Sequence, residues 1–240
     1  MITPVLNGTD TPGWDNWGVY AEFPAPPLAC LWVRVADDDC TPVLPDACSD
    51  LIWQAGRGAF VAGPDTGPSP VGSPGGSVFV GARFRPGAGG AALGLPLSEL
   101  RDLRVGLDEL DPALAERLPG DLAPEEALKR VAEIARTAPA PDAAIAEAAR
   151  RLADPATRVE TLADDIGLSE RQLRRRCHVA AGYGPKTLQR VLRFRRFLAT
   201  ADGDLARAAL DAGYADQSHL TRECTRLAGQ PPTALLAAWR

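Results

Sequence analysis

Residues 159–169, VETLADDIGLS, and residues 204–216, DLARAALDAGYAD, share one pattern, and this repeat decides the fold of the second half of the chain. In each copy, four apolar residues recur at helical spacing, and a glycine follows the last of them. That glycine is Gly167 in the first copy and Gly213 in the second. Glycine readily adopts the left-handed backbone that ends a helix, so each copy predicts a helix followed by a tight turn.

The helix after each glycine turn repeats as well. A capping residue, Ser169 or Asp216, precedes it. Its predicted inner face holds Leu173 and Cys177 in the first copy and Leu220 and Cys224 in the second. Both copies then end on a Gly-x-x-Pro element, GYGP at 182–185 and GQPP at 229–232. A single copy would leave a generic helical hairpin as an equal alternative, but matched caps, turns and endings favour two helix-turn-helix units.

The segment from about Asp142 to Arg240 resembles the DNA-binding domain of the AraC/XylS family of transcription regulators. Residues 212–222, AGYADQSHLTR, are close to the family signature, and GQPP follows as that family's Gly-x-x-Pro element. The resemblance implies an all-α domain with two helix-turn-helix units that binds double-stranded DNA. That family usually has Phe where Cys177 and Cys224 stand, so we expect each unit to pack more loosely here.

The outer face of the first recognition helix is rich in arginine. The resemblance places Arg171, Arg174 and Arg175 where family members contact bases, and Gln172 and His178 share that face. Arginine can bind guanine O6 and N7 through two hydrogen bonds, and glutamine can do the same for adenine. We therefore expect guanines in this half-site. The alternative is that the arginines bind only phosphate or form a solvated face.

The second recognition helix carries a more mixed outer face. Its outward-facing residues are Gln217, Ser218, His219 and Arg222. The resemblance places base and backbone contacts at these positions, and simple solvent exposure is the alternative for Ser218 and His219. Residues 185–198 are predicted to form a linker helix of about 20 Å, which would set the two recognition helices into successive major-groove turns ~34 Å apart. Arg193, together with Arg190 and Arg196, is expected to flank the DNA backbone.

The first hundred residues are rich in short β-type runs. Clusters of Gly, Pro and Asp separate these runs, which fit a small sandwich or an open barrel. The predicted strands are 30–35, 50–54, 59–62 and 78–84. Helical spacing begins near residue 98, and an Ala/Pro linker covers 137–141. The sequence thus predicts an α+β chain with a β-rich sensor domain at 1–100, a helical extension and linker at 101–140, and the double helix-turn-helix domain at 141–240.

The front half shows a resemblance of its own. Residues 43–52, VLPDACSDLI, 81–87, GARFRPG, and 93–100, LGLPLSEL, resemble an uncharacterised β-rich domain found ahead of AraC-type domains in actinobacterial regulators. The resemblance implies a cupin-like sensor fold and supplies no ligand. Aromatic residues in a small β-domain are usually core, and the alternative is an apolar pocket for a small-molecule effector. The candidate ligand-binding residues are Trp32, Trp53, Arg83 and Cys48, with Asp46, Asp50 or Arg85 as further polar groups.

The two halves differ in charge. Residues 141–240 carry 16 Lys and Arg against 12 Asp and Glu, a net charge of +4, whereas residues 1–140 carry 10 against 19, a net charge of −9. Fifteen of those 16 cations are arginines, whose planar fork suits phosphates and guanine edges. This asymmetry indicates polyanion binding by the back half. With no run of eighteen apolar residues and no signal-peptide pattern at the start, we expect a cytoplasmic protein without a membrane partner.

The sequence offers little for catalysis. The five cysteines are odd in number and expected to be reduced, and Cys30, Cys40 and Cys48 lack zinc-site spacing. No Gly-rich phosphate loop, Gly-x-Ser-x-Gly or His-x-x-x-His pattern occurs, so we expect no catalytic residue, metal or cofactor. The leading interpretation is a signal-responsive transcription factor, with RNA polymerase and a second copy of the chain as further candidate partners. The alternatives are a self-methylating repair regulator acting through Cys48 and a protein whose front half docks onto another protein.

Overall fold

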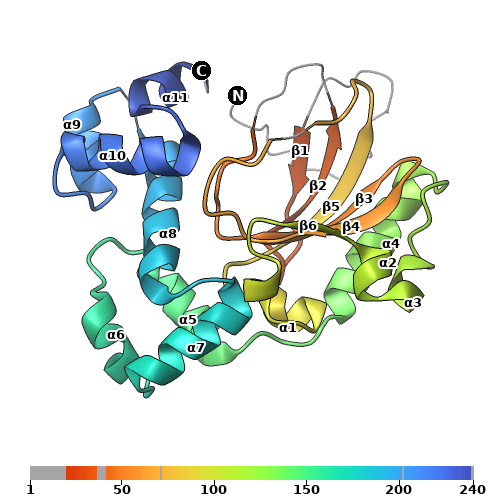
Figure 1. The fold of residues 1–240 in the computed structure, drawn as a ribbon, viewed down its shortest axis with the longest axis horizontal. Coiled ribbons are helices and arrows are strands. Elements are labelled where there is room, and N and C mark those ends of the chain that lie inside the picture. Colours follow the sequence, from red (N-terminus) through yellow and green to blue (C-terminus); the bar gives the residue numbers. More distant parts are fainter. Residues whose placement is uncertain (1–19, 37–41, 71, 202, 239–240) are drawn as a thin grey trace.

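The N-terminal half forms one antiparallel sheet in the computed structural model, which describes residues 20–36, 42–70, 72–201 and 203–238 (Figure 1). Its strands are β1 (Tyr20–Phe23), β2 (Cys30–Val35), β3 (Ser49–Gln54), β4 (Gly58–Ala62), β5 (Val78–Phe84) and β6 (Arg104–Gly106). They pair antiparallel in the order β1-β2-β5-β3-β4-β6. The four strands expected from the sequence are confirmed, and the two short edge strands were not predicted.

Helices cover one face of the sheet. Alternate residues of the strands, among them Trp53 and Val80, are buried against helix α4 (Pro124–Thr137), whose own apolar stripe includes Val131 and Ile134. The shorter helices of this half are α1 (Gly89–Leu93), η1 (Leu97–Glu99, a 3-10 helix), α2 (Leu107–Leu110) and α3 (Pro112–Ala115). β6 and α4 lie beyond residue 100, and both pack with the sheet, so the predicted helical extension is in contact with the sheet domain. The predicted domain boundaries at residues 100 and 140 stay predictions.

The opposite face of the sheet carries a second, smaller cluster that mixes apolar and charged side chains. Its apolar members include Trp32, Ile52 and Phe79. Gly81 on β5 faces the indole of Trp32, and a Cβ at this position would lie 2.2 Å from that ring. Glycine therefore lets the indole cross β5 and reach Asp50 on β3, to which Trp32 Nε1 donates a hydrogen bond of 2.6 Å.

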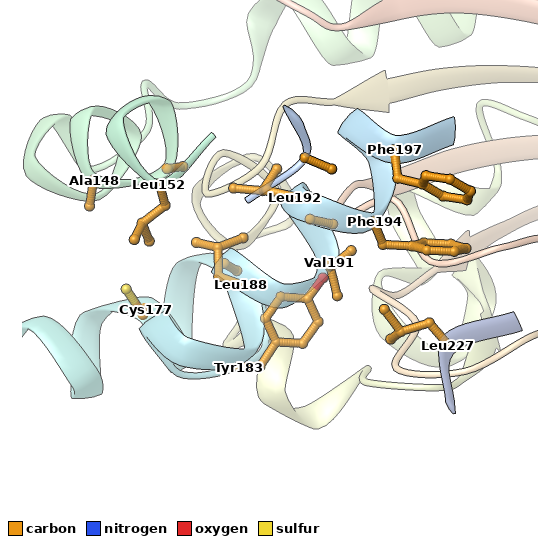
Figure 2. Close-up of a cluster of buried hydrophobic side chains, with 14 of the residues drawn as sticks. Ala148, Leu152, Cys177, Tyr183, Leu188, Val191, Leu192, Phe194, Phe197 and Leu227 are labelled. Carbon is orange, nitrogen blue, oxygen red and sulfur yellow. The ribbon is translucent and has the colours of Figure 1, made fainter. Parts of the chain in front are cut away.

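The C-terminal half is all α-helical, so the expected α+β class with a helical second domain is confirmed. Its helices are α5 (Ala143–Leu152), α6 (Val159–Asp165), α7 (Glu170–Ala181), α8 (Pro185–Thr200), α9 (Leu205–Asp211), α10 (Gln217–Ala228) and α11 (Pro232–Ala238). Helix α8 runs through the middle, and its buried residues Leu188, Val191, Phe194 and Phe197 hold the two helical units together (Figure 2). In the described parts of the chain, no helix is long and apolar enough to cross a membrane.

The two halves touch at several places, of which two involve buried residues close to the recognition helix or the helical core. Helix α1 lies beside α7 (Figure 1), and α1 and η1 both pack against α7. A Cβ on Gly90 of α1 would lie 2.3 Å from the carbonyl oxygen of Val179. The second place is the turn before β3, where the side chain of Ala47 is buried among the residues of the helical core. The sheet domain is therefore docked directly beside the first recognition helix.

Candidate nucleic-acid interface

The first helix-turn-helix unit consists of α6, the turn at Gly167 and α7. Gly167 adopts a φ of 72°, the left-handed conformation expected for the turn. Ser169 caps α7 by accepting a hydrogen bond from the backbone N–H of Gln172 at 3.3 Å. Gln172 completes the cap, because its Oε1 accepts from the backbone N–H of Ser169 at 2.9 Å and from its hydroxyl at 3.0 Å. Gln172 is thus exposed, as expected of a base-reading residue, but its side chain is engaged in holding the start of the helix.

The outer face of α7 presents three arginines. Arg171, Arg174 and Arg175 are exposed, and none has a hydrogen bond or ion pair among the residues that the structure describes. Arg176, by contrast, pairs with Asp142 at the start of α5, with Nε 2.7 Å from Oδ2. Leu173 and Cys177 face the core. One arginine of α7 is therefore paired within the protein, and the other three are available to a ligand.

His178 lies one turn further along α7 and is half-buried. Burial lowers the pKa of this imidazole, and the positive charges of Arg174 and Arg101 lower it further. Arg101 belongs to the sheet domain, so the docked domain brings a cation toward the end of the recognition helix. Sequence reasoning did not single out Arg101, because no periodic pattern relates it to α7.

The second helix-turn-helix unit repeats this geometry with a different outer face. Gly213 turns with a φ of 84°, and the Asp216 side chain caps α10 by accepting from the backbone N–H of His219 at 2.7 Å. Gln217, Ser218 and Arg222 are exposed. His219 is half-buried, since its ring packs edge-on against Tyr214 with centroids 5.3 Å apart and its Nδ1 accepts from the backbone N–H of Ala215. His219 therefore also supports the turn.

Most arginines of the linker helix α8 form ion pairs or hydrogen bonds within the protein. Arg190 pairs with Glu223 of α10 at 2.7 Å, and Arg196 donates to the backbone carbonyl of Asp211 at 2.8 Å. Arg193 is half-buried beside the Gly213 turn, with a buried Nε that has no partner in the described structure. Arg190 and Arg196 are thus engaged within the protein, Arg196 while remaining exposed, and a DNA-backbone contact by Arg193 and its neighbours stays a prediction.

Both cysteines at the inner positions of the recognition helices are fully buried. Burial is the main reason that the pKa of each thiol, Cys177 and Cys224, is raised to about 12. The two thiols are therefore neutral at physiological pH and act as small apolar core residues. Figure 2 shows Cys177 within the buried cluster. Cys30 and Cys48 are also free and buried, and Cys40 lies outside the described residues.

Three of the four candidate ligand-binding residues in the front half come together. Arg83 Nε lies 3.1 Å from Oδ1 of Asp50, which also accepts from Trp32, and 3.5 Å from Oδ2 of Asp46. Cys48 follows Asp46 in the same turn, and its backbone N–H donates to the Asp46 side chain at 2.9 Å. Burial raises the pKa of Asp50 to about 6, against the opposing effect of Arg83.

The fourth candidate, Trp53, lies on the opposite face of the sheet. It is fully buried under α4, and its Nε1 donates to the carbonyl oxygen of Pro119 at 2.8 Å. Tyr20 and Glu22 of β1 join the charged cluster instead, since Arg83 Nη1 lies 3.2 Å from both Tyr20 Oη and Glu22 Oε1. Sequence reasoning missed these two residues because β1 was not predicted.

Comparisons with known proteins match each half separately. Residues 162–238 match a family model described as a helix-turn-helix domain, and residues 24–106 match a domain of unknown function, DUF6597. No curated protein matches the chain. Among solved structures, the apo form of a point variant of ToxT from Vibrio cholerae matches with 11% identity over 86% of this chain and 97% of that chain, at a TM-score of 0.47. A second ToxT structure from Vibrio cholerae matches with 9% identity over 90% and 97%, at a TM-score of 0.44. The chain therefore joins an N-terminal DUF6597 domain to a C-terminal helix-turn-helix domain of the AraC type, the architecture of a DNA-binding transcription regulator.

Proposed function

We propose that this chain binds a specific DNA operator through α7 and α10 and that its N-terminal domain controls this binding in response to a chemical signal. One observation carries the DNA-binding part. Arg171, Arg174 and Arg175 stand exposed and unpaired on α7, while the adjacent Arg176 is held by Asp142. Unpaired arginines on the outer face of a recognition helix are the groups that read guanine edges in the major groove.

The two units have different roles in this proposal. Arg171, Arg174 and Arg175 select guanines in one half-site, with His178 contacting the neighbouring backbone, whereas α10 offers Gln217, Ser218 and Arg222 to a more mixed half-site. Helix α8 has 16 residues, which gives a rigid spacer of about 24 Å between the units. Gln172 and His219 act indirectly, since each supports a cap or a turn that positions a recognition helix, and Arg193 lies beside the Gly213 turn.

The control part of the proposal rests on the charged face of the sheet. A small molecule that displaces the Arg83–Asp50 pair or stacks on Trp32 would alter the turn at Asp46, which contacts α8 of the DNA-binding domain. The site of action would be the cytoplasm, and RNA polymerase or a second copy of the chain would be a partner at the promoter.

The alternative of methyl transfer to Cys48 is disfavoured by its environment. Burial raises the pKa of this thiol well above its usual value, and Asp46 raises it further. A nucleophilic cysteine needs a thiolate, which this site suppresses. Incubation with alkylated DNA followed by intact-mass measurement is therefore expected to give no adduct on Cys48.

The DNA-binding part is tested by selecting bound sequences from a random duplex pool. The wild-type chain should enrich one motif that contains guanines, and exchanging Arg174 and Arg175 for Ala should abolish this preference. Each bidentate arginine–guanine contact is worth roughly 1–3 kcal/mol of discrimination.

Arg150 and Arg151 supply the matched control, since both lie on α5, where they pair with Glu147. Exchanging these two for Ala removes the same charge and should leave the motif unchanged. Enrichment of the same motif by the Arg174/Arg175 variant would refute the assignment of α7.

A further inference from the structure

We propose that the cavity between the two domains is a binding site for a phosphate group, formed jointly by the sheet domain and both helix-turn-helix units. This proposal rests on the proposed function, because it adds a ligand class and a mode of control to the same DNA-binding face.

The cavity has a volume of 910 Å³, which is within the range of small-molecule sites. Its wall is built from α6, α7, the start of α8 and the end of α10, and the sheet domain closes it with Thr66, Arg101 and Asp102. Leu173, Tyr183 and Leu227 form part of its apolar floor. The sheet domain therefore contributes one edge of a cavity whose other lining residues come from the helix-turn-helix domain.

Three arginines from three parts of the chain meet at this cavity. Arg174 comes from α7, Arg226 from α10 and Arg101 from the sheet domain. Neither Arg174 nor Arg226 has a hydrogen bond or ion pair within the described part of the chain. Arg101 has only a distant contact of 4.0 Å with Asp102, whose carboxylate already accepts from the backbone N–H and the hydroxyl of Thr66. Two further cations of the lining are paired, Lys186 with Glu160 at 3.5 Å and Arg190 with Glu223 at 2.7 Å, and the carboxylate of Glu170 also lines the cavity. The unpaired guanidinium groups of Arg174 and Arg226 are therefore the charges available to an anion.

The start of helix α8 adds to this positive potential. Gly184, Pro185, Lys186 and Thr187 line the cavity, and Gly184 provides no side-chain cap for the first N–H groups of the 16-residue helix. An uncapped helix start favours an anion by its free N–H donors and its dipole. The lowered pKa of His178 agrees with this picture, since Arg174 and Arg101 oppose its protonation in addition to burial.

Phosphate fits this site better than a single carboxylate does, because several guanidinium forks and a helix start can each take an oxygen. Two sources supply that chemistry: a free phosphorylated small molecule or a phosphate of the DNA backbone. A free ligand would engage Arg174 and hold the domains together, so it would compete with the operator. A backbone phosphate would instead recruit Arg101 as an additional DNA contact.

The test compares Arg101→Gln with Arg117→Gln in the full chain. Both arginines lie in the sheet domain at similar exposure, 44% and 49% of the side chain, and each has an acidic neighbour at 4.0 Å. Calorimetric titration uses inorganic pyrophosphate as the free-phosphate probe. A scrambled DNA duplex, titrated at several salt concentrations, is the backbone-phosphate probe. Arg226→Gln provides a second substitution in the lining of the cavity, on α10.

Pyrophosphate binding that weakens at least about tenfold in Arg101→Gln and Arg226→Gln, but not in Arg117→Gln, supports a free phosphorylated ligand. If pyrophosphate does not bind and Arg101→Gln lowers the salt dependence of DNA binding by about one phosphate contact, a backbone phosphate is the occupant. The proposal is overturned if Arg101→Gln changes neither probe, or if Arg117→Gln changes both equally. A chain that binds no DNA at all refutes the proposed function instead, and the pyrophosphate titration remains informative in that case.

Discussion

Arg175 and Arg176 are neighbours in the sequence but have opposite environments. Arg175 is exposed and unpaired in the described structure, whereas Arg176 forms two hydrogen bonds with Asp142 and links α7 to α5. Arg175→Ala is therefore expected to leave stability unchanged and to lower operator preference by roughly 1–3 kcal/mol. Arg176→Ala should cost about 1 kcal/mol of unfolding free energy and retain the preferred motif.

Urea unfolding and competition with random DNA measure these two effects, and each variant serves as the control of the other. If Arg176→Ala changed the motif while Arg175→Ala did not, the orientation assigned to α7 would be reversed.

Asp142 gives the same helix pair a dependence on pH. Its carboxylate accepts from Arg176 and from the backbone N–H groups of Ala144 and Ile145, and these hydrogen bonds lower its pKa. A carboxyl whose pKa is lower in the folded state stabilises the protein above its unfolded pKa, about 3.9, and this stabilisation is lost as the pH falls below that value. Asp142→Asn keeps an acceptor for the cap but does not titrate. The free energy of unfolding of wild-type protein should therefore fall more steeply from pH 5 to pH 3 than that of Asp142→Asn, and parallel curves would rule out this contribution.

At the scale of elements, the docking of α1 on α7 depends on a glycine. A Cβ on Gly90 would lie 2.3 Å from the carbonyl oxygen of Val179, so any side chain forces the two helices apart. Gly67 is the matched control, because a Cβ there meets nothing within 4 Å. Gly90→Val should speed amide hydrogen exchange in α1 and at the end of α7, whereas Gly67→Val should match wild type. Unchanged exchange in Gly90→Val would mean that the two helices do not depend on each other.

The elements that the sequence predicts are those with a periodic pattern. Four strands and the helices of both helix-turn-helix units follow from alternation, helical spacing and caps. The edge strands β1 and β6 have only four and three residues, too few to show a period, and both were missed. The stretch after residue 97, which has helical spacing, is a 3-10 turn followed by β6.

The same distinction applies to the candidate site. Arg171, Arg174 and Arg175 were predictable because their exposure follows from the helix period. Arg226, which follows Arg222 by one helical turn, could have been found in the same way. The inward direction of Arg193 and the approach of Arg101 to α7 depend on packing between units that are distant in sequence, and no local pattern encodes such packing.

At the scale of the whole molecule, one turn connects the sheet face to the linker helix. Ala47 in this turn has a φ of 66°, unusual for a residue with a side chain, and is buried in the helical core. On one side Asp46 lies 3.5 Å from Arg83, and on the other its carbonyl oxygen accepts from Arg195 of α8 at 3.1 Å. The turn therefore contacts both domains and connects the charged face of the sheet directly to the linker helix α8.

Because both domains share this turn, we expect them to unfold together. Tryptophan fluorescence reports mainly on the N-terminal half, because four of the five tryptophans lie in the first 53 residues, and far-ultraviolet circular dichroism reports mainly on the helices. Because Ala47 and α1 bury surface against the helical domain, the two signals should change together during urea unfolding of the wild-type chain.

Arg195→Ala removes a side chain that crosses between the domains and should move the urea midpoints of the two signals apart. Arg196→Ala is the matched control, since this adjacent arginine also donates to one carbonyl, that of Asp211, but within the helical domain. Its two midpoints should stay together. Coincident curves in Arg195→Ala, or equal separation in both variants, would show that the crossing contact does not couple the domains.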